Sequence, residues 1–129
     1  MSFDFYKFLE VSKTIKNNSQ WVEEQHFIRT GISRAYYSVF RPARDKIKRF
    51  DFYDFMSEFK GSHDEIVKVL KILGIKQRKI RSLPHIFETL RRLRVNADYK
   101  DEKLNKEDLE KAISHAERCH SLIKQIQRY

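Results

Sequence analysis

The sequence contains few of the residues that interrupt or cross-link a chain. Among 129 residues there are one cysteine, three glycines and two prolines. Because Cys119 has no second cysteine to pair with, the fold cannot rest on an internal disulfide, and nothing in the cysteine content indicates secretion. A glycine-rich phosphate loop is also excluded, since Gly31, Gly61 and Gly74 are widely separated. The scarcity of glycine and proline favours helices with few interruptions.

Long apolar runs and a secretion signal are missing as well. No apolar run approaches the ~20 residues that span a bilayer, so we expect no membrane-spanning segment and no membrane partner. The N-terminal residues lack the basic region and apolar core of a signal peptide, and we therefore expect a cytoplasmic protein. The length of 129 residues is enough for one hydrophobic core, which predicts a single domain over residues 1–129.

Acidic residues are outnumbered by basic ones. The chain has 27 lysine and arginine residues against 18 aspartate and glutamate residues, which gives a formal net charge of +9. Such an excess favours a polyanionic partner, either a nucleic acid or an acidic protein. Net charge bears on association and not on the fold, so it leaves both kinds of partner open.

Side chains that bind metal ions are not grouped in the sequence. The five histidines are scattered, and no two of them have the spacing of metal ligands on a helix. We therefore expect no metal site, and no motif in the chain indicates a cofactor. The histidines are His26, His63, His85, His115 and His120.

Apolar residues recur at helical spacing along nearly the whole chain, without strand-like alternation. This pattern predicts an all-α fold, an up-and-down bundle of four to five helices joined by short loops. Ser62 and Asn105 have capping-box spacing and are expected to begin two helices. We expect Pro42 to kink or locally break the second helix, and Gly74 to end the third as a left-handed cap. The expected helices cover residues 4–16, 20–50, 62–74, 82–99 and 105–126.

Aromatic residues are concentrated between the second and third expected helices. Phe52, Tyr53, Phe55 and Phe59 all lie within residues 50–59. Rings at this density can stack on nucleic-acid bases, or they can pack beneath a loop as part of the core. We expect this stretch to be a connection folded against the core.

One face of the second expected helix is basic. A step of 100° per residue places Tyr37 and Arg41 within about 80° of Arg34, together with Arg44 and Lys48. The opposite face is apolar, so the helix can pack by that stripe and leave the basic stripe outside. A stripe that carries arginines and a tyrosine can hold an anion. The apolar residues are Ile32, Tyr36, Val39, Ala43, Ile47 and Phe50.

Charged residues also gather on one side of the fourth expected helix, where Arg91, Arg94 and Asp98 are followed by Tyr99. Arg94 and Asp98 are four residues apart and can form an ion pair that supports the last turn. A surface pair of this kind contributes only about 0–1 kcal/mol. Alternatively, the arginine holds a phosphate while Asp98 orients the guanidinium. The spacing leaves both interpretations open.

These segments resemble blocks of the HEPN-domain family. Ile32–Phe40 (ISRAYYSVF), His63–Ile66 (HDEI) and Leu93–Tyr99 (LRVNADY) occur in the family's order, and the Ala112-x-x-x-Ala116 helix follows. The resemblance covers nearly the whole chain. It implies a helical bundle that is commonly a homodimer and is associated with RNA or nucleotide binding. Many members are metal-independent ribonucleases that act as toxins or antiviral effectors, and prokaryotic members are often paired with a minimal nucleotidyltransferase antitoxin.

The chain departs from the nuclease members of that family at one motif. Those members use Arg-x(4–6)-His, in which the arginine stabilises phosphate charge and the histidine transfers a proton. Here Arg94 is followed by Asp98 and Tyr99, and a tyrosine with a reference pKa of about 10 is a poor general base at neutral pH. Arg78 and His85 satisfy the spacing, but they lie before and at the start of the fourth expected helix.

We therefore expect an HEPN-like protein that binds RNA or a nucleotide and lacks the usual nuclease site. Arg41 supports this expectation, because it stands where similar proteins have a histidine and replaces a titratable group by a fixed charge. The resemblance further implies a place in a toxin–antitoxin or defence system, a nucleotidyltransferase-type partner and a homodimer. The expected binding residues are Arg34, Tyr37, Arg41, Arg94, Asp98 and Tyr99.

Two alternative functions remain open from the sequence. A metal-independent ribonuclease toxin would use Arg94 or Arg78 with His85. A protein-interaction module would instead dock its basic face on an acidic partner protein. RNA cleavage in the presence of a chelator would identify the first alternative, and co-purification with a protein but no nucleic acid would identify the second.

Overall fold

The computed structural model describes residues 3–50 and 59–127, and over these ranges it contains five α-helices, two short 3-10 helices and no strand. The predicted all-α bundle is confirmed. None of the described helices is long and apolar enough to cross a bilayer. The elements in chain order are α1 (Lys7–Lys16), η1 (Trp21–Glu23), α2 (Gln25–Phe50), α3 (His63–Lys76), η3 (Arg78–Ile80), α4 (Leu83–Tyr99) and α5 (Lys106–Lys124).

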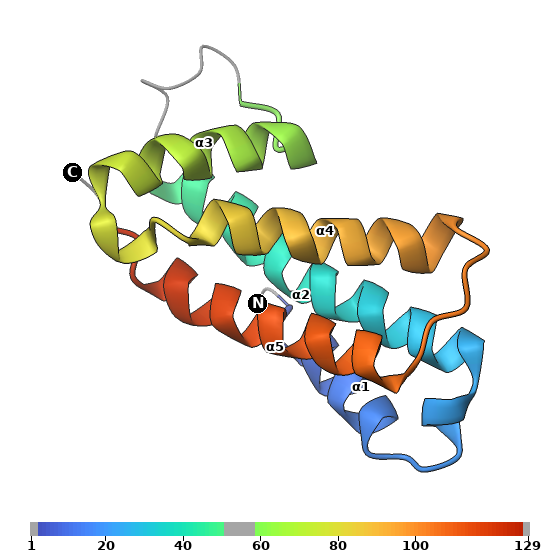
Figure 1. Ribbon diagram of the computed structural model, residues 1–129. Coiled ribbons are helices and arrows are strands. Elements are labelled where there is room, and N and C mark those ends of the chain that lie inside the picture. Colours follow the sequence, from blue (N-terminus) through green and yellow to red (C-terminus); the bar gives the residue numbers. More distant parts are fainter. Residues whose placement is uncertain (1–2, 51–58, 128–129) are drawn as a thin grey trace.

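Helix α2 is the centre of the bundle (Figure 1). It has 26 residues, which corresponds to a length of about 39 Å. It contacts each of the other four α-helices, and α4 packs in addition against α3 and α5. The apolar stripe predicted for this helix faces the core: Ile32, Ala43 and Tyr36 are fully buried. The opposite, basic side of α2 is therefore left at the surface, where it can form a site.

Local hydrogen bonds begin two of the helices where the sequence indicated. The Ser62 hydroxyl accepts the Glu65 N–H at 3.2 Å, and the Glu65 carboxylate accepts the Ser62 N–H at 3.0 Å. Asn105 and Asp108 exchange the equivalent bonds at 2.9 and 3.0 Å. Both capping boxes are confirmed, because each depends on residues only three positions apart.

The structure contradicts two expected helix interruptions, a break at Pro42 and an end at Gly74, whereas a kink at Pro42 stays a prediction. Helix α2 continues through Pro42 without a break, because buried residues on both sides hold it against the core and compensate for one lost backbone hydrogen bond. Helix α3 runs past Gly74 to Lys76. Gly74 instead allows the end of α3 to lie close to the backbone of Arg81, since a Cβ at this position would lie 3.3 Å from the Cα of Arg81. Among the described glycines, the left-handed conformation belongs to Gly61, with φ +84°.

The aromatic stretch between α2 and α3 is described only at its ends. Phe50 and Phe59 are partly buried and pack against the core, as expected for a connection folded against it. Phe52, Tyr53 and Phe55 lie outside the described residues. For these three rings, packing beneath a loop and stacking on a base both stay predictions.

Candidate functional site

The basic face of α2 borders an open hollow beside the start of α1. Arg34, Tyr37 and Arg41, which the helical spacing placed on one face, all line this hollow. Its volume is about 290 Å³. We call it the arginine hollow. Its other lining residues are Arg44, Phe5, Phe8 and Phe40.

Two arginines of the hollow lie on aromatic rings from the start of the chain. The Cζ atom of Arg41 is 4.4 Å from the centre of the Phe5 ring, and that of Arg34 is 4.8 Å from the Phe8 ring. A ring face attracts a guanidinium group but does not use up its hydrogen-bond donors. These contacts therefore hold two cations in place while their N–H groups stay available to a ligand.

Arg44 completes the hollow from the next turn of α2. Its Cζ atom is 5.7 Å from the centre of the Phe40 ring, and its Nε is 3.8 Å from a carboxylate oxygen of Asp45. The side chain runs over Gly61, where a Cβ would lie only 2.5 Å from the Cδ of Arg44. Gly61 is thus required both by its positive φ and by the path of this arginine.

Arg94 on α4 is a buried cation, with only 7% of its surface exposed. Its guanidinium carbon lies 5.3, 5.5 and 5.8 Å from the ring centres of Tyr36, Tyr37 and Tyr99. The predicted pair with Asp98 is present, but the hydrogen bond from Arg94 Nη1 to Asp98 Oδ2 is long, at 3.4 Å. Burial removes the guanidinium from water, and the three ring contacts and one long hydrogen bond offset only part of that cost.

The buried donors without a partner are all found on arginines of this region. In the part of the chain that the structure describes, the buried side-chain nitrogen or oxygen atoms that lack a hydrogen bond are the Nε atoms of Arg41, Arg44 and Arg94. Tyr37 connects the arginine hollow with Arg94, because it lines the hollow and also lies under the guanidinium of Arg94. Buried polar groups are normally satisfied. These three arginines therefore depart from the usual pairing of buried donors.

His63 belongs to this site, although the sequence analysis did not place it there. It is the first residue of α3, and its ring stacks on Phe40 with centres 4.5 Å apart. The hydroxyl of Tyr36 is hydrogen-bonded to His63 Nδ1. Burial lowers the pKa of His63, and Arg91 and Arg94 lower it further. Helical spacing could not have found this contact, because 27 residues separate His63 from Tyr36.

An ion pair joins α4 to the start of α3, next to His63. Arg91 Nη1 donates to Asp64 Oδ1 at 2.6 Å. This hydrogen bond lowers the pKa of the Asp64 carboxyl. Since Arg91 already has a carboxylate partner, it is less available to a ligand than Arg94, which lies one turn further along the same face of α4.

The end of α4 is tied to α2, which sets the position of the last two predicted residues. Arg29 donates to the backbone carbonyls of Ala97 and Lys100 at 2.9 and 2.6 Å. Ser33 lies 3.5 Å from the Asp98 carboxylate and donates to it. Tyr99 is 73% exposed, so one of its ring faces is open to solvent beside the buried arginine.

Arg78 and His85 are placed away from the arginine hollow. Both are exposed, on η3 and in the first turn of α4. Nine residues separate His85 from Arg94, which is about 13 Å along a helix. His85 lies instead near His115 on α5, whose pKa is lowered mainly by burial and further by Lys111, Arg118 and His85. The fold therefore does not bring His85 to the buried arginine of α4.

Other reactive side chains are not gathered elsewhere. Among the described residues, no group of three or more histidine, cysteine, aspartate or glutamate side chains is placed to hold a metal ion. Cys119 is fully buried, and burial raises the pKa of its thiol to about 12. The thiol therefore stays protonated and behaves as a small apolar core residue.

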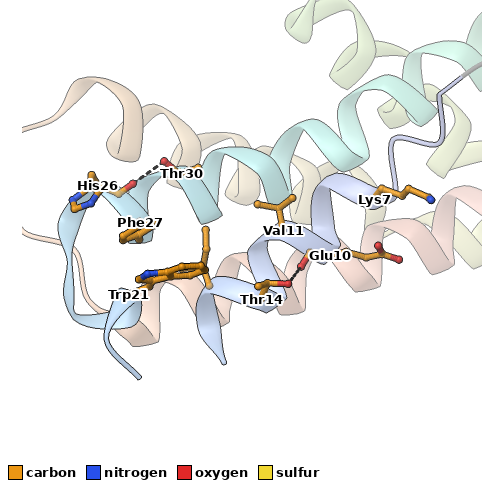
Figure 2. Close-up of a pocket in the computed structure, with 9 residues that line it drawn as sticks. Lys7, Glu10, Val11, Thr14, Trp21, His26, Phe27 and Thr30 are labelled. Atoms are coloured by element: carbon orange, nitrogen blue, oxygen red, sulfur yellow. Dashed lines mark hydrogen bonds between the residues drawn. The ribbon is translucent and has the colours of Figure 1, made fainter. Parts of the chain in front are cut away.

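A second hollow, of about 460 Å³, lies between α1 and the start of α2. Figure 2 shows Trp21 and Phe27 on one side of it and Val11 and Thr14 on the other. Trp21 and Phe27 are stacked, with ring centres 4.8 Å apart and 18° between their planes. Its lining includes Lys7 and Glu10 but no arginine, and it is therefore less basic than the arginine hollow.

Comparison with known proteins gives one family match. The model of the HEPN domain matches residues 55–126, which is more than half of the chain. The matched region includes α3, α4 and α5, and thus His63 and Arg94, whereas Arg34, Tyr37 and Arg41 precede it. No curated protein and no solved structure matches the chain.

Proposed function

The chain belongs to the HEPN family, and from that membership and the arginine site we propose that it binds RNA or a nucleotide through phosphate groups. The observation that carries this proposal is that the buried Nε atoms of Arg41, Arg44 and Arg94 make no hydrogen bond, although that of Arg44 lies 3.8 Å from an Asp45 carboxylate oxygen. A buried cation that is incompletely paired raises the free energy of the folded state. A phosphate accepts several charge-assisted hydrogen bonds at once. Because the Nε atoms are enclosed, it would bond to the outer Nη atoms of these guanidinium groups and balance their charge.

Tyrosines beside the arginines support a ligand that carries bases as well as phosphate. Tyr37 borders both the arginine hollow and Arg94, and Tyr99 is 73% exposed next to the same arginine. An aromatic ring next to a phosphate site can stack on a base without regard to its sequence. We therefore assign phosphate contact to Arg34, Arg41, Arg44 and Arg94, and base contact to Tyr37 and Tyr99.

Binding is favoured over RNA cleavage by the state of His63. Tyr36 is fully buried, and burial raises the pKa of its phenol, so the hydroxyl stays protonated. Its hydrogen-bond partner is His63 Nδ1, and we infer that the hydroxyl donates to this nitrogen. In neutral His63 the proton then lies on Nε2. This tautomer can donate a hydrogen bond to a phosphate, but its acceptor nitrogen is already occupied, which makes it a poor general base.

We propose that the domain works in a toxin–antitoxin or defence system, with a nucleotidyltransferase-type partner and as a homodimer. The support for this is the family resemblance, since prokaryotic HEPN proteins commonly have such partners and form dimers. Light scattering of the purified chain would measure the oligomeric state. Co-purification from cells that express both proteins would test the partner.

The phosphate assignment predicts a loss of RNA affinity when Arg41 is replaced by glutamine. A hydrogen bond to a charged group is worth about 1.5–3 kcal/mol, so we expect Arg41→Gln to bind a dye-labelled dodecauridylate (U12) about tenfold more weakly or worse. Fluorescence anisotropy in EDTA measures this, and the salt dependence of the wild-type affinity reports the number of phosphates contacted. Arg118→Gln is the matched control, since Arg118 is exposed on α5. Equal affinities of the two variants would contradict the assignment.

The affinity for RNA should also rise as the pH falls. His63 faces Tyr36 on α2, Arg91 and Arg94 on α4 and Asp64 on its own helix, and its pKa is lowered in the free protein. A bound phosphate offsets the two arginines and raises that pKa, and the Tyr36 hydroxyl can accept from the protonated Nδ1 instead of donating to it. Binding therefore takes up a proton and strengthens as the pH falls. Anisotropy titrations from pH 5 to 8 measure this dependence. We expect His63→Gln to flatten it, and an equally steep curve for that variant would show that His63 is not at the site.

A further inference from the structure

A second basic surface lies at the turn between α3 and α4. The stretch 66–87 contains six lysine and arginine residues and no aspartate or glutamate. Three of these cations, Arg78, Lys79 and Arg81, are exposed on and beside η3, and we call them the η3 corner. They make no side-chain hydrogen bond or ion pair with any residue that the structure describes. Their charge is therefore free to act on a partner.

The η3 corner is held rigidly by its surroundings. Ile80, in the middle of η3, is fully buried. Gln77 Nε2 donates to the carbonyl of Gln127 at 2.7 Å, and the Gln127 N–H donates back to Gln77 Oε1 at 2.9 Å. Gly74 lets the end of α3 approach the backbone of Arg81. The three cations are thus presented by a fixed backbone, which lowers the entropy cost of binding.

Helix α3 connects this corner to the phosphate site. It begins at His63, beside Arg91 and Tyr36, and ends at Lys76, next to η3. Figure 1 shows α3 lying along α4 and turning into it through η3. The 14 residues of α3 span about 20 Å. Two exposed lysines lie on the way, Lys68 and Lys71, and Lys71 Nζ lies 3.7 Å from a carboxylate oxygen of Glu88. A stacked strand advances about 3.4 Å per phosphate, so about six nucleotides cover this distance.

We propose that the η3 corner is a second contact for the RNA strand whose phosphate the arginine site holds, so that the strand follows α3 from one to the other. This inference rests on the proposed function. Phosphate recognition needs cations alone, and the η3 corner consists of cations. An acidic protein partner would use an apolar centre as well, whereas the large exposed apolar residue here is a single isoleucine, Ile75, at 79% exposure.

The test compares a short and a long RNA on two variants with the same net charge. The first variant is Arg78→Gln with Lys79→Gln and Arg81→Gln. The matched control replaces Lys100, Lys103 and Lys106, which are exposed around the loop before α5, by glutamine. The probes are dye-labelled tetrauridylate (U4) and U12, measured by anisotropy over a range of salt. Circular dichroism checks that both variants keep their helices.

We expect the η3 variant to bind U4 as the wild type does and to bind U12 up to about 100-fold more weakly at 0.1 M salt. For U12, the slope of log affinity against log salt should be smaller in magnitude by about 2 in the η3 variant than in the wild type. Three phosphate contacts are lost, and each contributes about 0.7 to the slope for a single strand. The control variant should lose much less on U12. Equal losses on U4 and U12, or equal losses in the two variants, would overturn the inference.

The remaining outcomes separate this inference from the function on which it rests. If the wild type binds U4 and U12 with the same affinity, the second contact does not exist, although the phosphate site stands. If the wild type binds neither probe, the proposed function itself fails. If the η3 variant loses affinity for polyglutamate but not for U12, the corner is a surface for an acidic protein and the inference is wrong.

Discussion

Replacing Arg94 by methionine is expected to make the protein more stable and to remove RNA binding. The arginine is buried beside Tyr36 and Tyr37 with one hydrogen bond of 3.4 Å. A methionine of similar length fills the same space without a charge to desolvate, and the Asp98 carboxylate left behind is partly exposed and keeps its hydrogen bond from Ser33. The lost contacts with the tyrosine rings offset part of the gain, so we expect the free energy of unfolding to rise by about 1 kcal/mol. Affinity for U12 should fall by about 100-fold, since the charged donors to the phosphate are lost. Urea unfolding and anisotropy measure the two effects.

The opposite signs of these two effects separate a binding role from a structural one. If Arg94 stabilised the folded state, its replacement would lower the free energy of unfolding, as breaking a well-formed buried ion pair does. Arg91→Met is the control. Arg91 has a short bond of 2.6 Å to Asp64, and its replacement is expected to give no gain in stability. A marked loss of stability in Arg94→Met would show that Arg94 is there for the fold and would remove the main support for the phosphate site.

The second large effect concerns acid stability and depends on His120. This side chain is 9% exposed, and its Nε2 lies 3.0 Å from the hydroxyl of Ser38. Burial lowers the pKa of His120 from 6.5 to about 4, with smaller effects from Lys124, Asp4 and Lys13. Between these values the unfolded chain binds a proton that the folded protein does not. The free energy of unfolding should therefore fall by about 3 kcal/mol as the pH drops from 6.5 to 4.

Urea titrations at a series of pH values from 4.5 to 7.5 would measure this loss. We expect His120→Gln, which keeps a polar partner for Ser38 but does not titrate, to depend much less on pH. His63 and His115 also have lowered pKa values, so part of the slope should remain. His26→Gln serves as the control because that side chain is 74% exposed. The same slope in His120→Gln and in the wild type would contradict the role of His120.

The individual helices and the basic face of α2 could be predicted because they depend on near neighbours. Ser62 and Asn105 begin helices through bonds to residues three positions away. Arg34, Tyr37 and Arg41 share a face because the helix repeats every 3.6 residues, and they do line one hollow. The prediction that Gly74 ends α3 is wrong. The small size of Gly74 allows a close contact with Arg81 on the next segment, which local spacing does not reveal.

The composition of the site could not be predicted, because its contacts join distant parts of the chain. Phe5 and Phe8 lie under Arg41 and Arg34 only after α1 has packed on α2. His63 meets Tyr36 only when α3 has docked. Hydrophobic periodicity points to Leu93 as a core residue of α4, but Leu93 is only partly buried and its neighbour Arg94 is the more buried of the two.

Local chemistry in the sequence thus determined the helices, the starts of α3 and α5, the family and the arginines that could meet a phosphate. The start of α2 was expected at residue 20, but the helix begins at Gln25 after the separate turn η1. The tertiary structure decided which of these arginines are buried, which lack a partner and which histidine lies beside them. The physical reason is the range of the interactions. Helix periodicity and capping act over three or four residues, whereas desolvation of Arg41 and Arg94 arises from the packing of whole helices on one another.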